Sequence, residues 1–171
     1  MKFLSYTTIL FLAAVLLTAC NKDPHTPKGV LDLDHHYYAI FFPNNNTAIT
    51  ATRSQAALVK LPVQFYSTFT RPYDAVCKYA VTTFGVTPPA VRGVDYDVVD
   101  KNGTVLTPVS DSSFQLIFPG AVQAMDTIYL KMLNNTMPGA RKFEVHILEN
   151  ITPEFTVDKF STAFRRPITI N

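Results

Sequence analysis

Two carboxylates stand two residues apart in this 171-residue chain, in the stretch Asp95-Tyr96-Asp97. On a strand, such residues share one face at about 7 Å, a separation of the order that paired-carboxylate glycoside hydrolysis uses. Any D-x-D segment on a strand has this property. The chain contains no G-x-S-x-G, H-E-x-x-H, G-x-x-x-x-G-K or C-x-x-C motif. We therefore expect no catalytic residues, no cofactor and no enzyme activity, with an unrecognised hydrolase as an alternative.

Two other side chains of reactive types, His146 and Cys77, are expected to have no chemical role. His146 alternates with the apolar residues Val145 and Ile147, so it faces outward as a solvated side chain. Cys77 shares strand parity with Tyr79, which predicts a small buried hydrophobe rather than a nucleophile.

Cys20 has a more specific context. Lys2 precedes the unbroken apolar run Ile9–Leu17, which is long enough to target a chain and too short to span a bilayer. Leu17 at the −3 position does not suit ordinary signal-peptide cleavage. Leu17-Thr18-Ala19-Cys20 instead resembles the bacterial lipobox, which implies a signal peptide over residues 1–19 and a lipidated Cys20. Two or three acyl chains, such as palmitate, hold a protein on a membrane firmly.

The remaining chain predicts a tether and one domain. Residues 20–36 are polar and broken by Pro24, Pro27 and Gly29, which is typical of a flexible tether. Residues 37–171 hold the apolar segments, enough for one domain in a chain that is 47% hydrophobic. The formal net charge is only +2 and the basic residues are scattered, so nucleic-acid binding is not expected.

Alternation with period two runs through the domain and predicts strands. The expected strands lie at residues 37–42, 59–65, 74–81, 98–99 with 105–106, 114–118, 127–132, 143–147 and 168–170. Asn102-Gly103 predicts a tight hairpin turn between the two short arms. Without a convincing amphipathic helix, this pattern predicts an all-β protein. We expect an antiparallel immunoglobulin-like β-sandwich of about seven or eight strands.

Two short motifs resemble one sandwich family. Gly93-Val94-Asp95-Tyr96 and the later Phe114–Gly120 resemble the G-x-D-Y … F-x-P-G pattern of Calx-beta domains, over about residues 57–150. Together with the lipobox, the chain resembles small cell-surface lipoproteins of Bacteroidota. That resemblance implies a place in the outer membrane beside nutrient-uptake systems.

The resemblance also bears on metal binding. Some Calx-beta domains bind calcium through acidic loops that include an Asp-Asp pair, and here the corresponding pair is Asn134-Asn135. Because calcium sites depend on several charged oxygens, we expect no metal site. In this interpretation Asp95 braces a turn.

The surface offers several candidate sites. Asp126-Thr127-Ile128 resembles a Bacteroidota O-glycosylation site, with Thr127 on the outward parity of its strand. Exposed aromatics grouped on one face would favour ligand stacking. The candidates for such a group are Tyr37, Tyr38, Tyr66, Tyr73 and Tyr129.

The sequence thus predicts a lipid-anchored, non-enzymatic binding or accessory module that faces the cell exterior. Its expected partner is a glycan, a peptide or an outer-membrane uptake protein. Asn21-Lys22-Asp23-Pro24 resembles the Bacteroidota surface-export signal, although it has one acidic residue where two are usual. A structural or adhesive surface module without a soluble ligand is the alternative.

Overall fold

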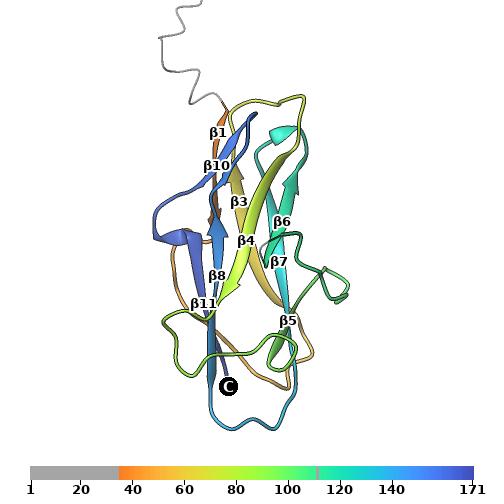
Figure 1. Ribbon diagram of the computed structural model, residues 1–171, viewed down its shortest axis with the longest axis vertical. Helices are drawn as coiled ribbons and strands as arrows, with labels where there is room; N and C mark the ends of the chain where they lie inside the picture. The colour runs from red at the N-terminus through yellow and green to blue at the C-terminus, as the bar shows by residue number, and fades with distance from the viewer. Residues whose placement is uncertain (1–34, 111) are drawn as a thin grey trace, which may run out of the picture. The chain divides into compact units, whose positions relative to one another are not determined.

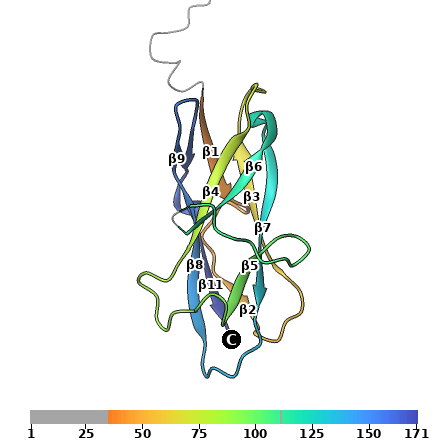
Figure 2. The same ribbon diagram turned by 45° about the vertical axis from the view of Figure 1, so that its right-hand side comes forward.

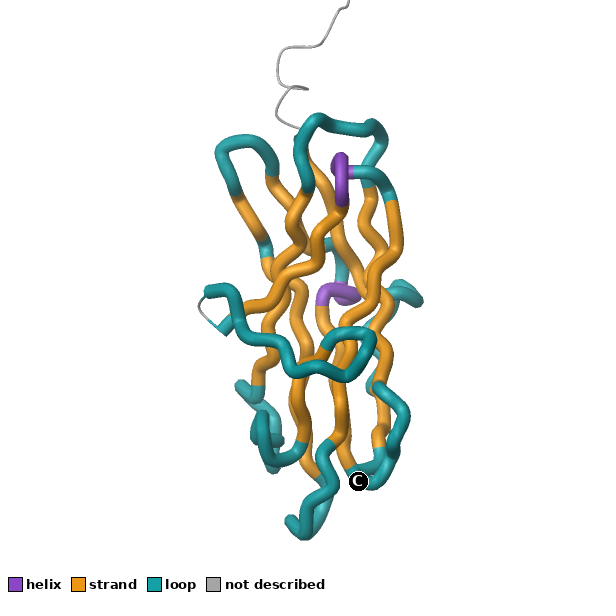
Figure 3. The backbone as a smooth tube through the Cα atoms, turned by 90° about the vertical axis from the view of Figure 1, so that its right-hand side faces the viewer, coloured by secondary structure: helices purple, strands orange, loops and turns teal. Residues whose placement is uncertain are grey.

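A computed structural model describes residues 35–110 and 112–171, so Cys20 and nearly all of the predicted tether lie outside the described residues. The described residues form two sheets packed face to face, and the axes of their strands are roughly aligned (Figures 1 and 3). Sheet A contains, in spatial order, β5 (Tyr96–Val99), β7 (Ala124–Met132), β3 (Val59–Tyr66), β1 (His36–Phe41), β10 (Thr156–Lys159) and β9 (Asn150–Ile151). Sheet B contains β2 (Ile49–Ala51), β11 (Arg165–Ile170), β8 (Arg141–Leu148), β4 (Ala75–Thr82) and β6 (Ser113–Phe118). The predicted all-β sandwich is confirmed.

The period-two pattern of the sequence becomes the two faces of each strand. In β3, Leu61, Val63 and Phe65 are buried between the sheets while their neighbours point outward. The Phe65 ring stacks on Phe118 of the opposite sheet at 4.4 Å between centroids. Tyr96 likewise stacks on Phe143 of sheet B at 4.0 Å, which ties the edge strand β5 to the core. Burial of such aromatic pairs stabilises the contact between the sheets.

The strand count was too low and the pairing is not wholly antiparallel. Eleven strands occur in the described residues, against the seven or eight predicted. The three that the sequence did not predict are β2, β9 and β10, which are only two to four residues long. Two pairings, β1 with β10 and β2 with β11, are parallel. Such short strands carry too few alternating residues to be recognised from periodicity. Figure 2 shows β9 beyond β1 and β2 near the C-terminus.

The predicted hairpin at Asn102-Gly103 is present. Val99 and Val105 form an antiparallel bridge, and Leu106 N–H donates to the Val98 carbonyl at 2.9 Å. The Asp100 carboxylate accepts the N–H groups of Asn102 and Thr104, both at 2.8 Å, and these bonds lower the pKa of Asp100. This turn therefore gains its own side-chain brace.

Helical structure is limited to two short turns in the described residues, η1 (Pro119–Ala121) and η2 (Thr162–Phe164), drawn purple in Figure 3. None of the described helices is long and apolar enough to cross a membrane. The connection from β10 to β11 contains Phe160 and η2. It places Phe160 over the outer face of sheet A.

Candidate functional site

Two of the predicted tyrosines meet on the outer face of sheet A. Tyr38 of β1 pairs directly with Tyr66 of β3, so the two side chains project from the same face. The Phe160 ring meets Tyr38 edge to face, with centroids 5.6 Å apart. These three rings, with Ile40 and Asn44, line an open groove of about 350 Å³, which we call the aromatic groove. Its size and mostly apolar lining are those of a small-molecule site.

The chain following β10 positions Phe160. β10 runs parallel to β1, with Asp158 opposite Tyr38, so the residues just beyond β10 return to this face. The Ser161 hydroxyl donates to Asn44 Oδ1 at 3.2 Å and also accepts from Ala163 N–H, which starts η2. Phe160 nevertheless remains 53% exposed. Because β10 before it and Ser161 after it are both anchored, Phe160 has a fixed position, and its exposed ring is available to a ligand.

Polar side chains contact the two tyrosines that line the aromatic groove. The His36 ring stacks on Tyr38 at 5.2 Å, and its Nε2 lies 3.5 Å from Asp158 Oδ2. The Tyr66 hydroxyl donates to Gln64 Oε1 at 2.9 Å. The groove therefore combines apolar ring faces with hydrogen-bonding groups near its edge, the combination that orients a ligand bearing both kinds of surface.

Tyr37 and Tyr73 do not join the groove. Tyr37 is 3% exposed, its ring packs on Phe65, and its hydroxyl lies 2.8 Å from that of Tyr73. Tyr73 stacks on Phe155 at 5.4 Å, and its hydroxyl also lies 2.6 Å from His35 Nδ1. Desolvation, reinforced by Tyr37, raises the pKa of Tyr73 well above its ordinary value. These two tyrosines brace the sandwich interior.

Two further predicted residues lie on the outer face of β7. Tyr129 pairs with Lys60 of β3 and is half-buried, but it does not line the aromatic groove. Thr127 pairs with Pro62, and its side chain is half-buried on the same outward parity. Its N–H donates to the neighbouring Asp126 carboxylate at 2.7 Å. Glycosylation of Thr127 stays a prediction.

The G-x-D-Y end of the sandwich is closed by hydrogen bonds. Asp95 is 2% exposed, and its Oδ2 accepts from Val91 N–H at 2.8 Å. Its Oδ1 accepts from the side-chain amide of Asn135 at 3.0 Å, and the same Asn135 nitrogen donates to the Val94 carbonyl at 2.7 Å. Asn135 belongs to the Asn134-Asn135 pair, which by the resemblance stands where some Calx-beta domains have two acids. Its N–H group therefore meets a carboxylate at a position where a calcium ligand would need an oxygen.

The two carboxylates of the D-x-D segment, Asp95 and Asp97, lie in different environments. Asp97 lies 3.9 Å from Arg92 Nε and is partly buried, whereas Asp95 is fully occupied at the turn. Within residues 35–110 and 112–171, no group of three or more His, Cys, Asp or Glu side chains is placed to hold a metal ion.

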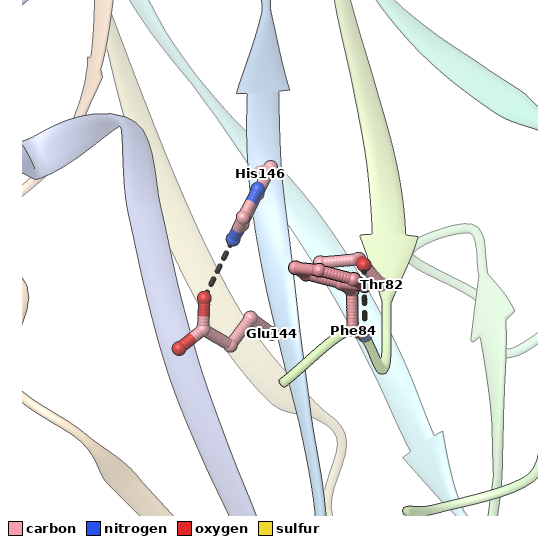
Figure 4. A network of polar contacts seen from close by, with 4 residues as sticks. All are labelled: Thr82, Phe84, Glu144 and His146. Carbon is pink, nitrogen blue, oxygen red and sulfur yellow. Dashed lines mark hydrogen bonds and ion pairs between the residues drawn. The ribbon is translucent and has the colours of Figure 1, made fainter. Parts of the chain in front are cut away.

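Cys77 and His146 lie on opposite faces of sheet B. Cys77 is fully buried, and desolvation raises its pKa to about 12, which keeps the thiol protonated and inert at neutral pH. His146 faces outward as expected but is not free in solvent. Its Nε2 lies 2.6 Å from Glu144 Oε2 (Figure 4), and its ring meets Phe164 edge to face.

Several residues of the candidate site were not expected from the sequence. Phe160 and Asn44 lie in connections, and no local pattern marks a loop residue as part of a groove. The alternation of buried Phe155 and Val157 with half-buried Thr156 is a signal that would have located β10, and with it Phe160.

No family model matches the chain, and no curated protein matches it significantly. Among solved structures, it is similar to the apo-form Calx CBD1 domain, with 12% identity and a TM-score of 0.50 over 79% of this chain and 97% of that chain. It is also similar to the Calx CBD2 domain, with 14% identity and a TM-score of 0.51 over 78% of this chain and 85% of that one. CBD12 from CALX1.2 gives 13% identity and 0.51 over 78% of this chain and 44% of that one. These likenesses confirm a Calx-beta-like fold.

Proposed function

We propose that this protein is a lipid-anchored, non-enzymatic binding module that captures a glycan in the aromatic groove. The observation that carries the proposal is the convergence of Tyr38, Tyr66 and Phe160 around an open groove of about 350 Å³. A sugar ring has apolar C–H faces and a polar hydroxyl edge. The faces suit stacking on aromatic rings, and the hydroxyls suit the polar groups of Asn44 and its surroundings.

A binding role rather than catalysis is supported by the carboxylates. Asp95 is held by two N–H donors from separate segments, and Asp97 lies beside Arg92. A general acid or base must reach a substrate proton within hydrogen-bond distance, and the buried Asp95 does not offer that access.

The proposed location of the protein rests on its sequence rather than on its structure. Lipid on Cys20 and the tether after it would hold the groove at the outer-membrane surface, where an external glycan could be passed to an uptake system. Cys20→Ala should move the protein from the membrane fraction to the soluble fraction, whereas Cys77→Ala should leave it on the membrane. Unchanged membrane association of Cys20→Ala would contradict the anchor.

The groove is tested by isothermal titration against a panel of oligosaccharides. Tyr38→Ala and Tyr66→Ala should each weaken binding by about tenfold, because each removes one stacking surface worth about 1 kcal/mol or more. Tyr129→Ala is the matched control, since Tyr129 lies on the same outer face without lining the groove. Equal losses for Tyr129→Ala and Tyr38→Ala would contradict this site. A failure of the wild type to bind any oligosaccharide would contradict the glycan proposal.

A further inference from the structure

A second groove, of about 400 Å³, lies where the chain leaves sheet A. β1 ends at Phe41, and residues 42–48 carry the chain across to β2 in sheet B (Figures 1 and 2). β3 continues past the end of β1, so the crossing opens a notch beside Lys60 and Pro62. None of the described residues that line this notch is acidic, and Lys60 and Arg166 are its two cations.

Arg166 is an unusual residue for its position. It is 4% exposed and points from β11 into the sandwich, with its guanidinium over the Phe41 ring at 5.3 Å. It donates to Asn45 Oδ1 at 2.6 Å, to the Pro43 carbonyl at 3.0 Å and to the Thr47 carbonyl at 3.3 Å. All three acceptors are neutral. In the part of the chain that the structure describes, no carboxylate lies within ion-pair distance of Arg166.

A buried cation without an anion is energetically costly. Desolvation lowers the pKa of Arg166 below its ordinary value, which expresses the same cost. The three hydrogen bonds use three of the five guanidinium N–H groups, so two donors remain. An oxyanion entering the notch would offset the buried charge and would accept hydrogen bonds from the guanidinium more strongly than neutral oxygens do.

The notch and the aromatic groove are neighbours on one stretch of chain. Asn44 lines the aromatic groove and Asn45 lines the notch, so the short segment between Pro43 and Asn45 separates them. Phe42, just past the end of β1, is four residues from Tyr38, or about 13 Å at the rise of an extended chain. An oligosaccharide spans this distance, whereas a single sugar does not.

We propose that the ligand is an acidic oligosaccharide, with a carboxylate or sulfate group in the notch beside Lys60 and Arg166 and a neighbouring sugar ring in the aromatic groove. This inference rests on the proposed glycan-binding function and adds the charge class of the glycan. The aromatic groove supplies the stacking surface, and the notch selects for the anion.

The test compares oligosaccharides of equal length: one neutral, one containing a uronate and one containing a sulfate ester. Titrations at low salt should show at least one of the acidic oligomers binding about tenfold more tightly than the neutral one, and this preference should shrink at high salt. A preference for one acidic oligomer over the other identifies whether the anion is a carboxylate or a sulfate. Tyr38→Ala should weaken binding of all three.

Lys60→Gln is the decisive variant, because Lys60 is exposed, whereas Arg166 is buried and its substitution would also disturb the fold. It should weaken the preferred acidic oligomer by about fivefold and leave the neutral one unchanged. Lys101→Gln, an exposed lysine of the Asp100–Thr104 turn, is the matched control and should change neither.

Equal binding of neutral and acidic oligomers would overturn this inference and leave the glycan-binding proposal intact. An acidic preference that Lys60→Gln does not reduce, or that Lys101→Gln reduces equally, would overturn the notch as the anion site. Binding to no oligomer would overturn both proposals together.

Discussion

Tyr37 and Tyr38 are neighbours in sequence and face opposite sides of β1. Tyr37 is buried among aromatic rings, and its hydroxyl is matched to another protein hydroxyl. Tyr38 is half-buried, and its ring forms one wall of an open groove. On the inner face, side chains pack on and hydrogen-bond with one another. On the outer face, ring surface and polar atoms remain accessible to a ligand. This difference separates residues that hold the fold from residues that can hold a ligand.

The largest expected effect tests this difference directly. Tyr37→Ala should lower the free energy of unfolding by about 3–5 kcal/mol, because it removes a buried aromatic ring and leaves a cavity. Tyr38→Ala should lower it by about 1 kcal/mol, because its ring is only partly buried. Urea denaturation followed by fluorescence or circular dichroism measures both. Equal losses would show that the outer ring is as structural as the inner one.

A polar version of the comparison uses Asp95 and Asp97. Asp95→Ala leaves the Val91 N–H and the Asn135 amide without their acceptor, so the free energy of unfolding should fall by about 2–3 kcal/mol. Asp97→Ala removes a single ion pair at 3.9 Å, near the surface, and should cost about 0.5 kcal/mol. The same denaturation experiment decides between them. A larger loss for Asp97→Ala would contradict the role of Asp95 as the brace of this end.

The inner face was largely predictable from the sequence because burial follows parity. Leu61, Val63 and Phe65 alternate with polar or exposed neighbours, and the sheet that buries them leaves that alternation in the sequence. The same logic placed Cys77 inside and His146 outside. It did not place Tyr37, which stands beside Tyr38 in a run without clear alternation.

The outer face was less predictable because its groupings come from tertiary pairing. The neighbours Tyr38 and Tyr66 are 28 residues apart, and Phe160 arrives from a parallel strand that the sequence did not reveal. Arg166 is a further case: its alternation with Ile168 gives it the inward parity of β11, but nothing in the sequence shows that its guanidinium meets only neutral oxygens. Register and loop position, rather than periodicity, assemble these sites.

Alkaline pH probes the inner face through its buried acids. Burial raises the pKa of Cys77 from 9.0 to about 12 and that of Tyr96 from 10.0 to about 12. Above about pH 9 the unfolded chain releases protons that the folded chain retains, so the free energy of unfolding should fall as pH rises towards 12. The slope for one such group reaches about 1 kcal/mol per pH unit. Denaturation midpoints measured between pH 8 and 10.5 follow this decline.

Cys77→Ala isolates the contribution of the thiol. Whatever it does to stability at pH 8, the variant should show a shallower decline between pH 9 and 10, because Cys77 has the lowest ordinary pKa of these buried acids and is the largest single contributor to the proton release there. A slope identical to that of the wild type would mean that the thiol ionises equally in both states, and that Cys77 is not sealed in the core.

The smallest expected effect concerns calcium at the end that Asp95 closes. Millimolar calcium should leave the melting temperature unchanged, because a ligand raises it only when its dissociation constant for the folded state lies below the added concentration. Asn135 presents N–H groups to Asp95, and these repel a cation. Asn135→Asp reverses that arrangement by placing a second carboxylate beside a buried one. It should lower the melting temperature through like-charge repulsion, and calcium should then restore part of the loss. A calcium-dependent rise of several degrees in the wild type would show that the amide does not exclude the ion. The closed end would then have to be regarded, like the outer face of β1, as a surface open to ligands.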